Sequence, residues 1–496
     1  MRAADTSEYK ETAGRIRSLV KQAAKKHPDM VVLPECAYPA YMLEYDKGET
    51  EQALALQEDL ERELAGLARE YGLYLVAGLP HRREGRLYNG ALVYGPQGEL
   101  VTWAEKQNLW HFDHKTFAVG DPPRVFDTPF GRVGIMICAD GRIPEVARAL
   151  RLQGAGLILD LVNLVAGGNR PENLQNQQRQ FMLPCRAAEN GAVIAVCNKC
   201  GVERGMITYL GRSCVLGKDG KTLAQCGPEK EEILFCDLGD ISPGPGEQDN
   251  LLTRQPECYS PLTDPGLRTP VSERGIPAYT LLARFEAETV EEYHRLAHQF
   301  LRGAQVMDAR LILLPEWTGE LARLGLEALS EDLPEGVCLL AAGRDREMSR
   351  AELWTRRGRA DKVESPCQSQ GVGISVLRGG GLSLGVCFRA EPWTPEIIRV
   401  QMLLGADLSV WYTETPWPEL LQRTRSVENR IFVAQMARRG TCSLTGPDGA
   451  MCANTYEKGA HAAAAYIDPG LSRWKDVVPG TNIVTDRHPE LMKGLT

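Results

Sequence analysis

The fold is decided around residues 133–148, which read VGIMICADGRIPEVAR. An apolar run ends at Cys138, and a segment with helical character begins at Pro144. A strand that stops at a cysteine and turns sharply into a helix aims the thiol rigidly, and the N–H groups of the turn face whatever the sulfur attacks. The motif alone is weak evidence, because buried cysteines are common and mostly inert.

Two charged residues occur in matching settings. Glu35 follows the apolar run of residues 30–34, and Lys106 lies within residues 102–110, at the end of another predicted strand. Taken singly, such residues are more often a strand-end acid, a surface lysine and a core cysteine. Together with Cys138 they have the chemistry of a general base, an oxyanion stabiliser and a nucleophile.

Each of the three side chains has a definite chemical task. A nearby cation lowers the pKa of a cysteine thiol and so favours the reactive thiolate. A carboxylate can take the thiol proton and later pass a proton to a leaving amine. A lysine ammonium and a backbone N–H can stabilise the oxyanion formed on an amide carbonyl, and losing one such donor costs on the order of 10²–10³ in rate.

These motifs resemble those of the nitrilase, or carbon–nitrogen hydrolase, superfamily, which carries a Glu–Lys–Cys triad in this order. The resemblance covers about residues 10–260 and includes a Leu-Pro before the glutamate, an Arg-x-Pro-Glu-x-x-Arg after the cysteine, and segments 186–190 and 209–213. It implies that Glu35, Lys106 and Cys138 form the catalytic triad. Ala139, in the turn that donates to the oxyanion, is implied as a supporting residue.

The loop after the lysine is expected to hold another supporting acid. Members of the family often carry a second glutamate there, which buttresses the triad. In this sequence the matching place falls on Asp113 or His114, and Asp113 is our choice, although aspartate reaches about one methylene less far. His111 and His114 flank this aspartate, but an active-site loop is favoured over a metal site.

Length and charge narrow the class of protein. A chain of 496 residues is expected to hold at least two domains. A net charge of −8 argues against nucleic acid or an anionic membrane as a main partner, which leaves a small-molecule substrate and water. No apolar run of about 18 residues predicts a transmembrane helix, and the first residues lack the pattern of a signal peptide.

The 14 cysteines follow no disulfide-framework spacing. Cys197 and Cys200 form a lone Cys-x-x-Cys without a second pair, so neither a metal nor another cofactor is expected. Reduced thiols, which a catalytic cysteine needs, favour a cytoplasmic location.

The second half of the chain repeats motifs of the first half. The matched segments are 30–36 with 310–317, 73–78 with 338–343, 134–138 with 384–387, 144–148 with 395–399, and 186–190 with 425–429. This repetition predicts two tandem domains, at residues 1–260 and 277–496. Residues 261–276, rich in proline and glycine, are the predicted linker.

Each repeat alternates strands with amphipathic helices, which predicts an α/β fold. The resemblance implies two tandem α-β-β-α sandwich domains that pair within the chain as a pseudo-dimer, and further homo-oligomerisation is left open. The second repeat opens with a strand at residues 278–284, whereas the first begins in a helix at about residues 10–26. Either that strand is lost from the first repeat or the true start lies upstream.

The second repeat keeps counterparts of the triad. Glu316 and Cys387 match the glutamate and the cysteine, and Lys362 is the best candidate for the lysine. The segments between them are shorter than in the first repeat. Since an error of about 1 Å in such a site can cost on the order of 10²-fold in rate, the second domain is expected to be divergent and non-catalytic.

The residues after Cys138 resemble those of amidases and carbamoylases, whereas branches that cut nitriles usually have Trp-Glu there. We expect a hydrolase that cleaves a non-peptide C–N bond of a small linear amide or N-carbamoyl compound through a cysteine thioester. A nitrilase, an acyltransferase to an amine, and a non-catalytic ligand-binding or regulatory protein stay open as alternatives.

Overall fold

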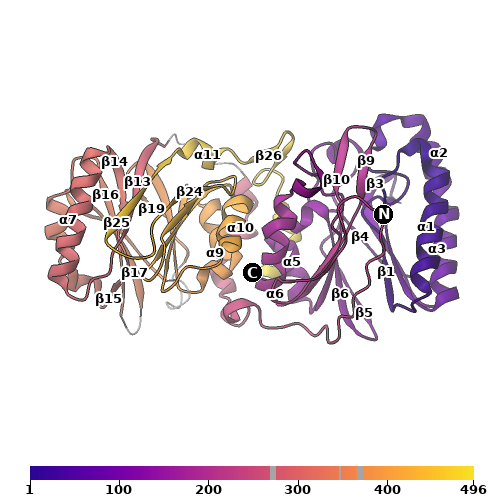
Figure 1. Ribbon diagram of the computed structural model, residues 1–496, viewed down its shortest axis with the longest axis horizontal. Coiled ribbons are helices and arrows are strands. Elements are labelled where there is room, and N and C mark those ends of the chain that lie inside the picture. The colour runs from indigo at the N-terminus through magenta and orange to yellow at the C-terminus, as the bar shows by residue number, and fades with distance from the viewer. Residues whose placement is uncertain (269–274, 346–347, 366–372) are drawn as a thin grey trace. The chain divides into compact units, whose positions relative to one another are not determined.

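The computed structural model describes residues 1–268, 275–345, 348–365 and 373–496 (Figure 1). Contacts divide the chain into two compact units: Met1–Glu247 with Val478–Thr481 (unit 1), and Gln248–Val477 with Asn482–Thr496 (unit 2). None of the helices in these described ranges combines the length and apolar character needed to cross a membrane.

The division between the units falls earlier in the chain than the predicted end of the first domain. Residues 248–260 belong to unit 2. For example, the Asn250 side chain donates a hydrogen bond to Trp393 O at 2.6 Å. Residues 269–274 of the predicted linker lie outside the described part of the chain.

Unit 1 contains two sheets between helices. The first sheet has the order β1-β2-β3-β4, with bounds Met30–Val32, Tyr74–Arg83, Arg86–Tyr94 and Leu100–Glu105. The second has the order β12-β11-β8-β7-β6-β5: Thr222–Gln225, Cys214–Leu216, Val193–Asn198, Leu157–Val162, Gly131–Ile137 and Val125–Thr128. A separate hairpin pairs β9 (Cys200–Glu203) with β10 (Ile207–Leu210).

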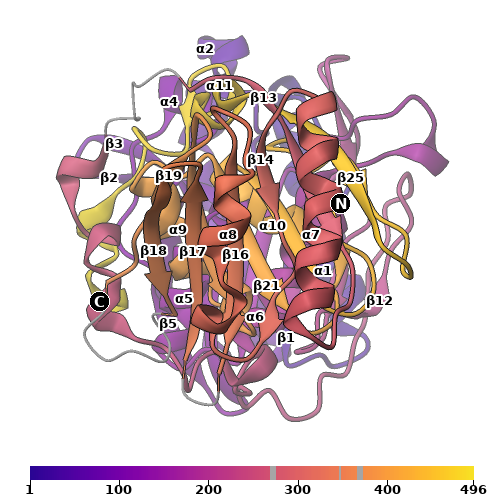
Figure 2. The same ribbon diagram turned by 90° about the vertical axis from the view of Figure 1, so that its left-hand side faces the viewer.

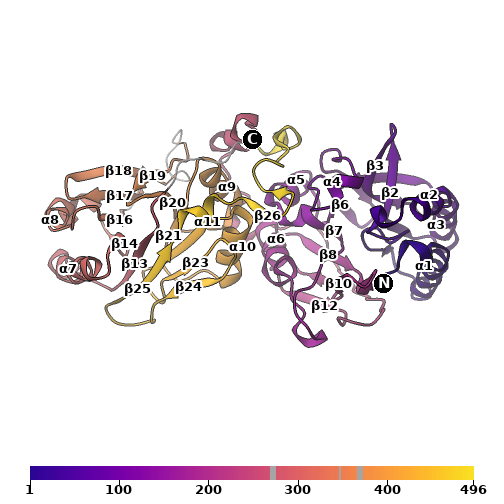
Figure 3. The same ribbon diagram turned by 90° about the horizontal axis from the view of Figure 1, so that it is seen from above.

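The helices of unit 1 cover the outer faces of these sheets, apart from the four-residue helix that begins at Asp113 in the loop after β4. They are α1 (Tyr9–Ala24), α2 (Lys47–Ala55), α3 (Gln57–Tyr71), α4 (Asp113–Thr116), α5 (Pro144–Leu152) and α6 (Leu183–Asn190). Figure 3 shows α1 and α3 on one side of the two sheets and α5 and α6 on the other. Unit 1 is therefore an α-β-β-α sandwich, and its first helix matches the predicted one.

Unit 2 repeats this architecture. Its first sheet has the order β18-β17-β16-β14-β13-β25, with β15 beside β16: Gly358–Glu364, Ser349–Thr355, Cys338–Arg344, Ala309–Leu313, Ala278–Arg284, His461–Ile467 and Trp317–Thr318. The second sheet runs from β19 to β24 in chain order: Leu377–Gly379, Leu382–Phe388, Leu408–Thr413, Phe432–Ala437, Ser443–Thr445 and Met451–Asn454. The opening strand β13 was predicted from the sequence.

The helices of unit 2 again lie outside the sheets. They are α7 (Val290–Val306), α8 (Leu326–Glu331), α9 (Pro395–Leu403), α10 (Glu419–Asn429) and α11 (Pro469–Arg473). Figure 2 shows α7 and α8 lying across the first sheet. A short hairpin near the C-terminus pairs β26 (Asp476–Val478) with β27 (Thr481–Asn482).

Hydrophobic periodicity explains the layers. In α3 the buried side chains include Leu60, Leu64 and Leu67, which lie three or four residues apart and therefore share one face. In contrast, all six residues of β7 are buried, as expected for a parallel strand covered on both faces. Asp160 is the acidic residue in that otherwise apolar strand, and it lies beside the site described next.

Candidate active site

Glu35 lies just beyond β1, where a close backbone contact fixes it. Ala37 N donates to Gly78 O at 2.8 Å, which holds the glutamate loop against β2. A Cβ atom on Gly78 would stand 2.1 Å from Pro34 O and 2.8 Å from Glu35 Cα, so only glycine permits this approach. The carboxyl group of Glu35 is fully buried.

The Glu35 carboxylate has one occupied oxygen and one free oxygen. Oε1 accepts from Lys106 Nζ at 2.8 Å and from Asn89 Nδ2 at 2.7 Å. Oε2 is buried and has no hydrogen-bond partner among the described residues. An unpartnered buried carboxylate oxygen is poised to accept a proton or a ligand hydrogen bond.

Lys106 follows β4 and is fully buried. Its ammonium lies 2.7 Å from Asp113 Oδ2, in addition to its contact with Glu35. Burial by itself lowers the pKa of Lys106, but the carboxylates of Asp113 and Glu35 outweigh burial and hold that pKa well above its usual value. Lys106 is therefore a fixed cation between two acids.

The structure decides between Asp113 and His114 at the predicted place for the second acid. Asp113 begins α4 and is buried, whereas His114 is exposed. Trp110 N donates to Asp113 Oδ2 at 2.9 Å, which closes the loop after Lys106 around the aspartate. Asp113 thus contacts Lys106, and its role as a supporting acid stays a prediction.

Cys138 occupies a left-handed turn at the end of β6. Its φ is 52°, an uncommon value for a residue other than glycine and one that marks functional sites. The turn is held by side chains on both sides of the residue: Cys138 N donates to Asp160 Oδ1 at 3.1 Å, and Gln178 Nε2 donates to Cys138 O at 2.6 Å. The following Ala139 is buried within the 3₁₀ turn Cys138–Arg142.

Burial and neighbouring charges shift the pKa of the Cys138 thiol. Burial raises its pKa well above the usual value, and the carboxylate of Glu35 raises it further, whereas Lys106 acts in the opposite direction. The net shift is upward in spite of Lys106. The thiol needs a proton acceptor, and Glu35 is close enough to affect its pKa.

Asp140 connects the cysteine turn with the lysine loop. Its Oδ1 accepts from the backbone N–H groups of Gln107 and Asn108 at 3.2 and 2.9 Å, and Oδ2 accepts from Ile137 N at 3.1 Å. Asp140 lies in the segment after Cys138 that resembles those of amidases and carbamoylases, but the sequence alone assigned it no task. The structure makes it the brace between two segments that are far apart in the sequence.

Three further buried residues belong to the site and were not predicted: Asn89, Asp160 and Asn163. Asn163 Nδ2 donates to Glu35 O at 3.1 Å, so the glutamate is held by its backbone as well as by its side chain. Their only sequence signal was polarity within an apolar strand or, for Asn163, directly after one, and their contacts depend on how the strands are arranged.

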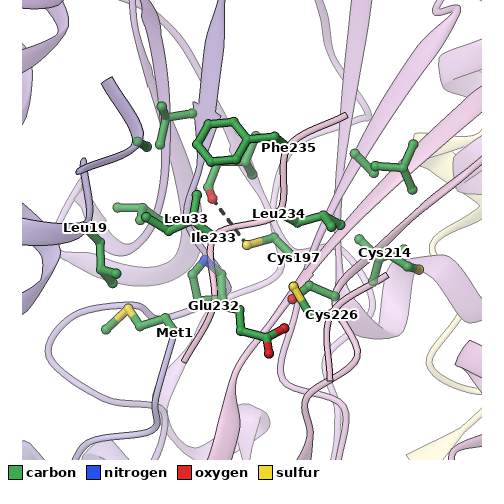
Figure 4. Close-up of a pocket in the computed structure, with 18 of the residues that line it drawn as sticks. Met1, Leu19, Leu33, Cys197, Cys214, Cys226, Glu232, Ile233, Leu234 and Phe235 are labelled. Atoms are coloured by element: carbon green, nitrogen blue, oxygen red, sulfur yellow. Dashed lines mark hydrogen bonds between the residues drawn. The ribbon is translucent and has the colours of Figure 1, made fainter. Parts of the chain in front are cut away.

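An apolar cavity of about 190 Å³ lies elsewhere in unit 1 (Figure 4). Leu33, Cys197, Cys226 and Phe235 are among its lining residues, and Cys197 Sγ donates to Val32 O at 3.3 Å. Glu35, Lys106 and Cys138 are not among the residues that line it. The cavity is therefore separate from the buried acid–lysine cluster.

The predicted triad of the second repeat does not come together. Glu316 is buried after β14, but the side chain of Lys362 is 54% exposed on β18, with its Nζ 3.9 Å from Glu364 Oε1. Cys387 lies inside β20, where Gln401 Nε2 donates to its sulfur at 3.4 Å. Lys362 and Cys387 therefore do not occupy the positions in unit 2 that match Lys106 and Cys138 in unit 1.

Backbone positions show which residues of unit 2 stand at the positions of Cys138 and Lys106. Gly385 and Pro395 have the same spacing as Gly134 and Pro144, and this gap-free register puts Arg389, not Cys387, at the position of Cys138. Arg389 also has the left-handed backbone of the nucleophile turn, with a φ of 49°.

The lysine position has changed as well. Lys106 N donates to Asn89 O in unit 1, and Ser365 N donates in the same way to Ser349 O in unit 2. Ser365 therefore replaces the lysine. The sequence alignment on Lys362 was wrong because it matched residue type rather than strand pairing.

Comparisons with known proteins agree with this fold. The family model for carbon-nitrogen hydrolases matches residues 3–240 and 338–476. The chain is 33% identical over 226 residues to a nitrilase of Pyrococcus abyssi, covering 45% of this chain and 82% of that protein. It is 30% identical over 236 residues to omega-amidase NIT2 of Homo sapiens, covering 45% of this chain and 81% of that protein.

Among solved structures, an amidase from Nesterenkonia sp. matches with a TM-score of 0.41 and 25% identity, over 46% of this chain and 84% of that chain. The two family-model matches together span more than half of the sequence. The protein belongs to the carbon-nitrogen hydrolase family and carries two copies of its fold in tandem, the second of them divergent.

Proposed function

We propose that the protein is an amide hydrolase in which Cys138 is the nucleophile, Glu35 the general base and acid, and Lys106 the oxyanion stabiliser. The observation that carries this proposal is the buried Glu35–Lys106–Asp113 cluster beside the left-handed turn of Cys138. Two acids and a lysine are costly to bury together, and such sites are retained where their chemistry is used.

The first half of the reaction forms a thioester. The Cys138 proton moves to Glu35, whose Oε2 has no other hydrogen-bond partner among the described residues, while sulfur bonds to the amide carbon. The oxyanion faces the Lys106 ammonium and the backbone N–H at Ala139. The C–N bond then breaks, Glu35 passes its proton to the nitrogen, and ammonia or an amine leaves.

Water completes the cycle. Glu35 takes a proton from water as the water oxygen adds to the thioester carbon, and Lys106 again faces the oxyanion. The C–S bond then breaks, a carboxylic acid leaves, and the sulfur regains a proton. Asp113 keeps Lys106 in place throughout, because its carboxylate contacts the ammonium at 2.7 Å and is not consumed in the reaction.

The proposed substrates are small linear amides or N-carbamoyl compounds. The omega-amidase relatives support an amide, and the nitrilase relative makes a nitrile the competing substrate. The protein is proposed to act on a soluble small molecule with water as co-substrate, as the sequence analysis expected. The location in the cytoplasm and the pairing of the two units stay predictions.

Ammonia release from butyramide, N-carbamoylglycine and butyronitrile tests the proposal directly. The wild type should release ammonia from at least one of the first two, and Cys138→Ala should lose more than 99% of that activity. Cys214→Ala, a matched removal of a buried thiol in the same unit, should keep it. Faster turnover of the nitrile would make the protein a nitrilase, and equal activity of Cys138→Ala and wild type would refute the nucleophile.

A further inference from the structure

Unit 2 contains a cavity of about 420 Å³ beside its retained glutamate. It is called the Glu316 cavity here, and its charged lining residues are Glu286, Glu288, Glu292, Glu316, Arg438 and Arg439. A volume of this size lies in the range of small-molecule sites. Trp317 and Phe285 add aromatic surface to the lining.

Glu316 is the buried polar group of this cavity. Only 6% of its surface is exposed, and its Oε1 has no hydrogen-bond partner within the described residues of either unit. In unit 1 the matching Glu35 meets Lys106 and Asn89, but serines hold those two positions in unit 2. Glu316 has therefore lost its protein donors while staying buried, so a ligand donor would satisfy it.

Arginines gather on another side of the Glu316 cavity. Arg438 Nε lies 3.2 Å from each oxygen of Glu414, and Arg438 Nη1 donates to Thr318 Oγ1 at 2.8 Å. Arg344 and Arg439 also contact Glu414, at 3.4 and 3.5 Å. One carboxylate cannot use all the N–H donors of three guanidinium groups or neutralise their charge. The remaining donors and positive charge suit a ligand carboxylate.

The opposite charge comes from a different segment. Glu286, Glu288 and Glu292 lie between the end of β13 and the first turn of α7, and all three line the cavity. The cavity thus has an acidic wall, in which Glu286 pairs with Arg284, and an arginine wall, whose two arginines contact Glu414; Glu316 also lines the cavity. A ligand with a single charge would satisfy one wall and be repelled by the other.

We propose that the Glu316 cavity binds a small zwitterion, of the class of free amino acids and short ω-amino carboxylates. The carboxylate contacts Arg438 and Arg439, and the ammonium donates to Glu316 beside the acidic wall. The second domain then keeps a ligand site where its relatives' fold places a catalytic one. This inference does not depend on the reaction in unit 1.

Calorimetric titration of the full chain tests this proposal with γ-aminobutyrate as the probe. Butyrate and butylamine serve as analogues that lack one charge each. The zwitterion should bind with a stoichiometry of one, and each analogue should bind at least tenfold more weakly. Absence of binding by γ-aminobutyrate at 10 mM, roughly the weak end of small-ligand affinity, would overturn the proposal.

Variants locate the bound molecule. Glu316→Gln and Arg438→Gln should each weaken γ-aminobutyrate at least tenfold, and Glu316→Gln should leave the weak affinity for butyrate unchanged. Arg359→Gln is the matched control. Arg359 lies on the edge strand β18, pairs with Glu352 and does not line the cavity. A melting curve for each variant separates misfolding from loss of the site.

The first unit supplies the last control. γ-Aminobutyrate contains no amide, so a failure of the hydrolase proposal leaves this titration unaffected. Binding should be the same in Cys138→Ala and in wild type. Loss of binding in Cys138→Ala, or equal affinities for γ-aminobutyrate and butyrate, would contradict a zwitterion site in unit 2.

Discussion

Asn108 donates two hydrogen bonds to one oxygen of Asp140, from its backbone N–H and from Nδ2, both at 2.9 Å. Asn108 lies two residues after the proposed oxyanion lysine, and Asp140 lies two residues after the proposed nucleophile. One carboxylate therefore sets the spacing between the two groups. In the proposed reaction this spacing decides whether the ammonium reaches the oxyanion.

Asp140→Asn should lower kcat by about 10- to 100-fold. The NH₂ group of the amide would face N–H groups that now donate hydrogen bonds to Asp140, and this repulsion would shift the turn by a fraction of an ångström. Steady-state ammonia release measures the effect. Asp127→Asn, which changes an exposed aspartate of unit 1, is the matched control and should stay near wild type.

The pH profile should reveal Asp140 as well. Burial raises the pKa of this carboxyl to about 6. Because the folded pKa lies above the usual value, protonated Asp140 contributes stability in acid that is lost as the pH rises through about 6. Activity should instead rise with pH over the same range, since only the ionised carboxylate accepts all of the hydrogen bonds that hold the turn. We expect kcat/KM to fall below about pH 6 in wild type, and an unchanged acid limb in Asp140→Asn would exclude Asp140 as its source.

Gly78→Ala should lower activity by about 10²-fold. Its new Cβ would displace the Glu35 loop, and positioning errors of about 1 Å have this cost. Gly66→Ala is the control: Gly66 lies within α3, a Cβ there meets nothing within 4 Å, and the change should stabilise the protein by about 0.5–1 kcal/mol. Activity and thermal midpoints of both variants provide the measurement, and a fully active Gly78→Ala would contradict the tight placement of Glu35.

Lys106→Met should abolish activity and reduce stability by about 3–5 kcal/mol, because it leaves Glu35 and Asp113 buried without their shared cation. Adding Glu35→Gln and Asp113→Asn to this variant should restore most of the stability and none of the activity. Urea unfolding gives the free energies. If Lys106→Met alone were as stable as wild type, the buried cluster would contribute far less than its geometry indicates.

Cys387→Ala should leave ammonia release within about 20% of wild type, since Cys387 is inside a strand and its contacts are with Gln401 and Ser409. A small loss of stability is expected from the missing sulfur. A fall to half the wild-type rate would instead show that unit 2 has a working site.

The sequence predicted the parts of the site that lie in local motifs. The strand that ends at Cys138 and the acid at Glu35 need only a short window of residues, so they could be read directly. Asn89 could not, because it meets Glu35 through the pairing of β3 with its neighbours. Such register is set by packing over the whole sheet rather than by nearby residues.

The error at Cys387 has a similar cause. The sequence comparison matched a cysteine to a cysteine, which required two extra residues in the following turn. Aligning Gly385 and Pro395 with Gly134 and Pro144 needs no insertion, and this alignment puts Arg389 at the position of Cys138. A glycine and a proline, which fix backbone geometry, are better anchors for alignment than a reactive side chain that selection is free to replace.

The left-handed turn at Arg389 makes unit 2 a ready template for protein engineering. Its backbone already has the left-handed bend found at Cys138, and Glu391 Oε2 accepts from Phe388 N at 2.8 Å much as Asp140 accepts from Ile137 N. Arg389→Cys with Ser365→Lys would put a thiol and an ammonium at the two positions of unit 2 that match Cys138 and Lys106. The two units differ here in side chains rather than in the main chain, and a difference of that kind is one that a designer can reverse.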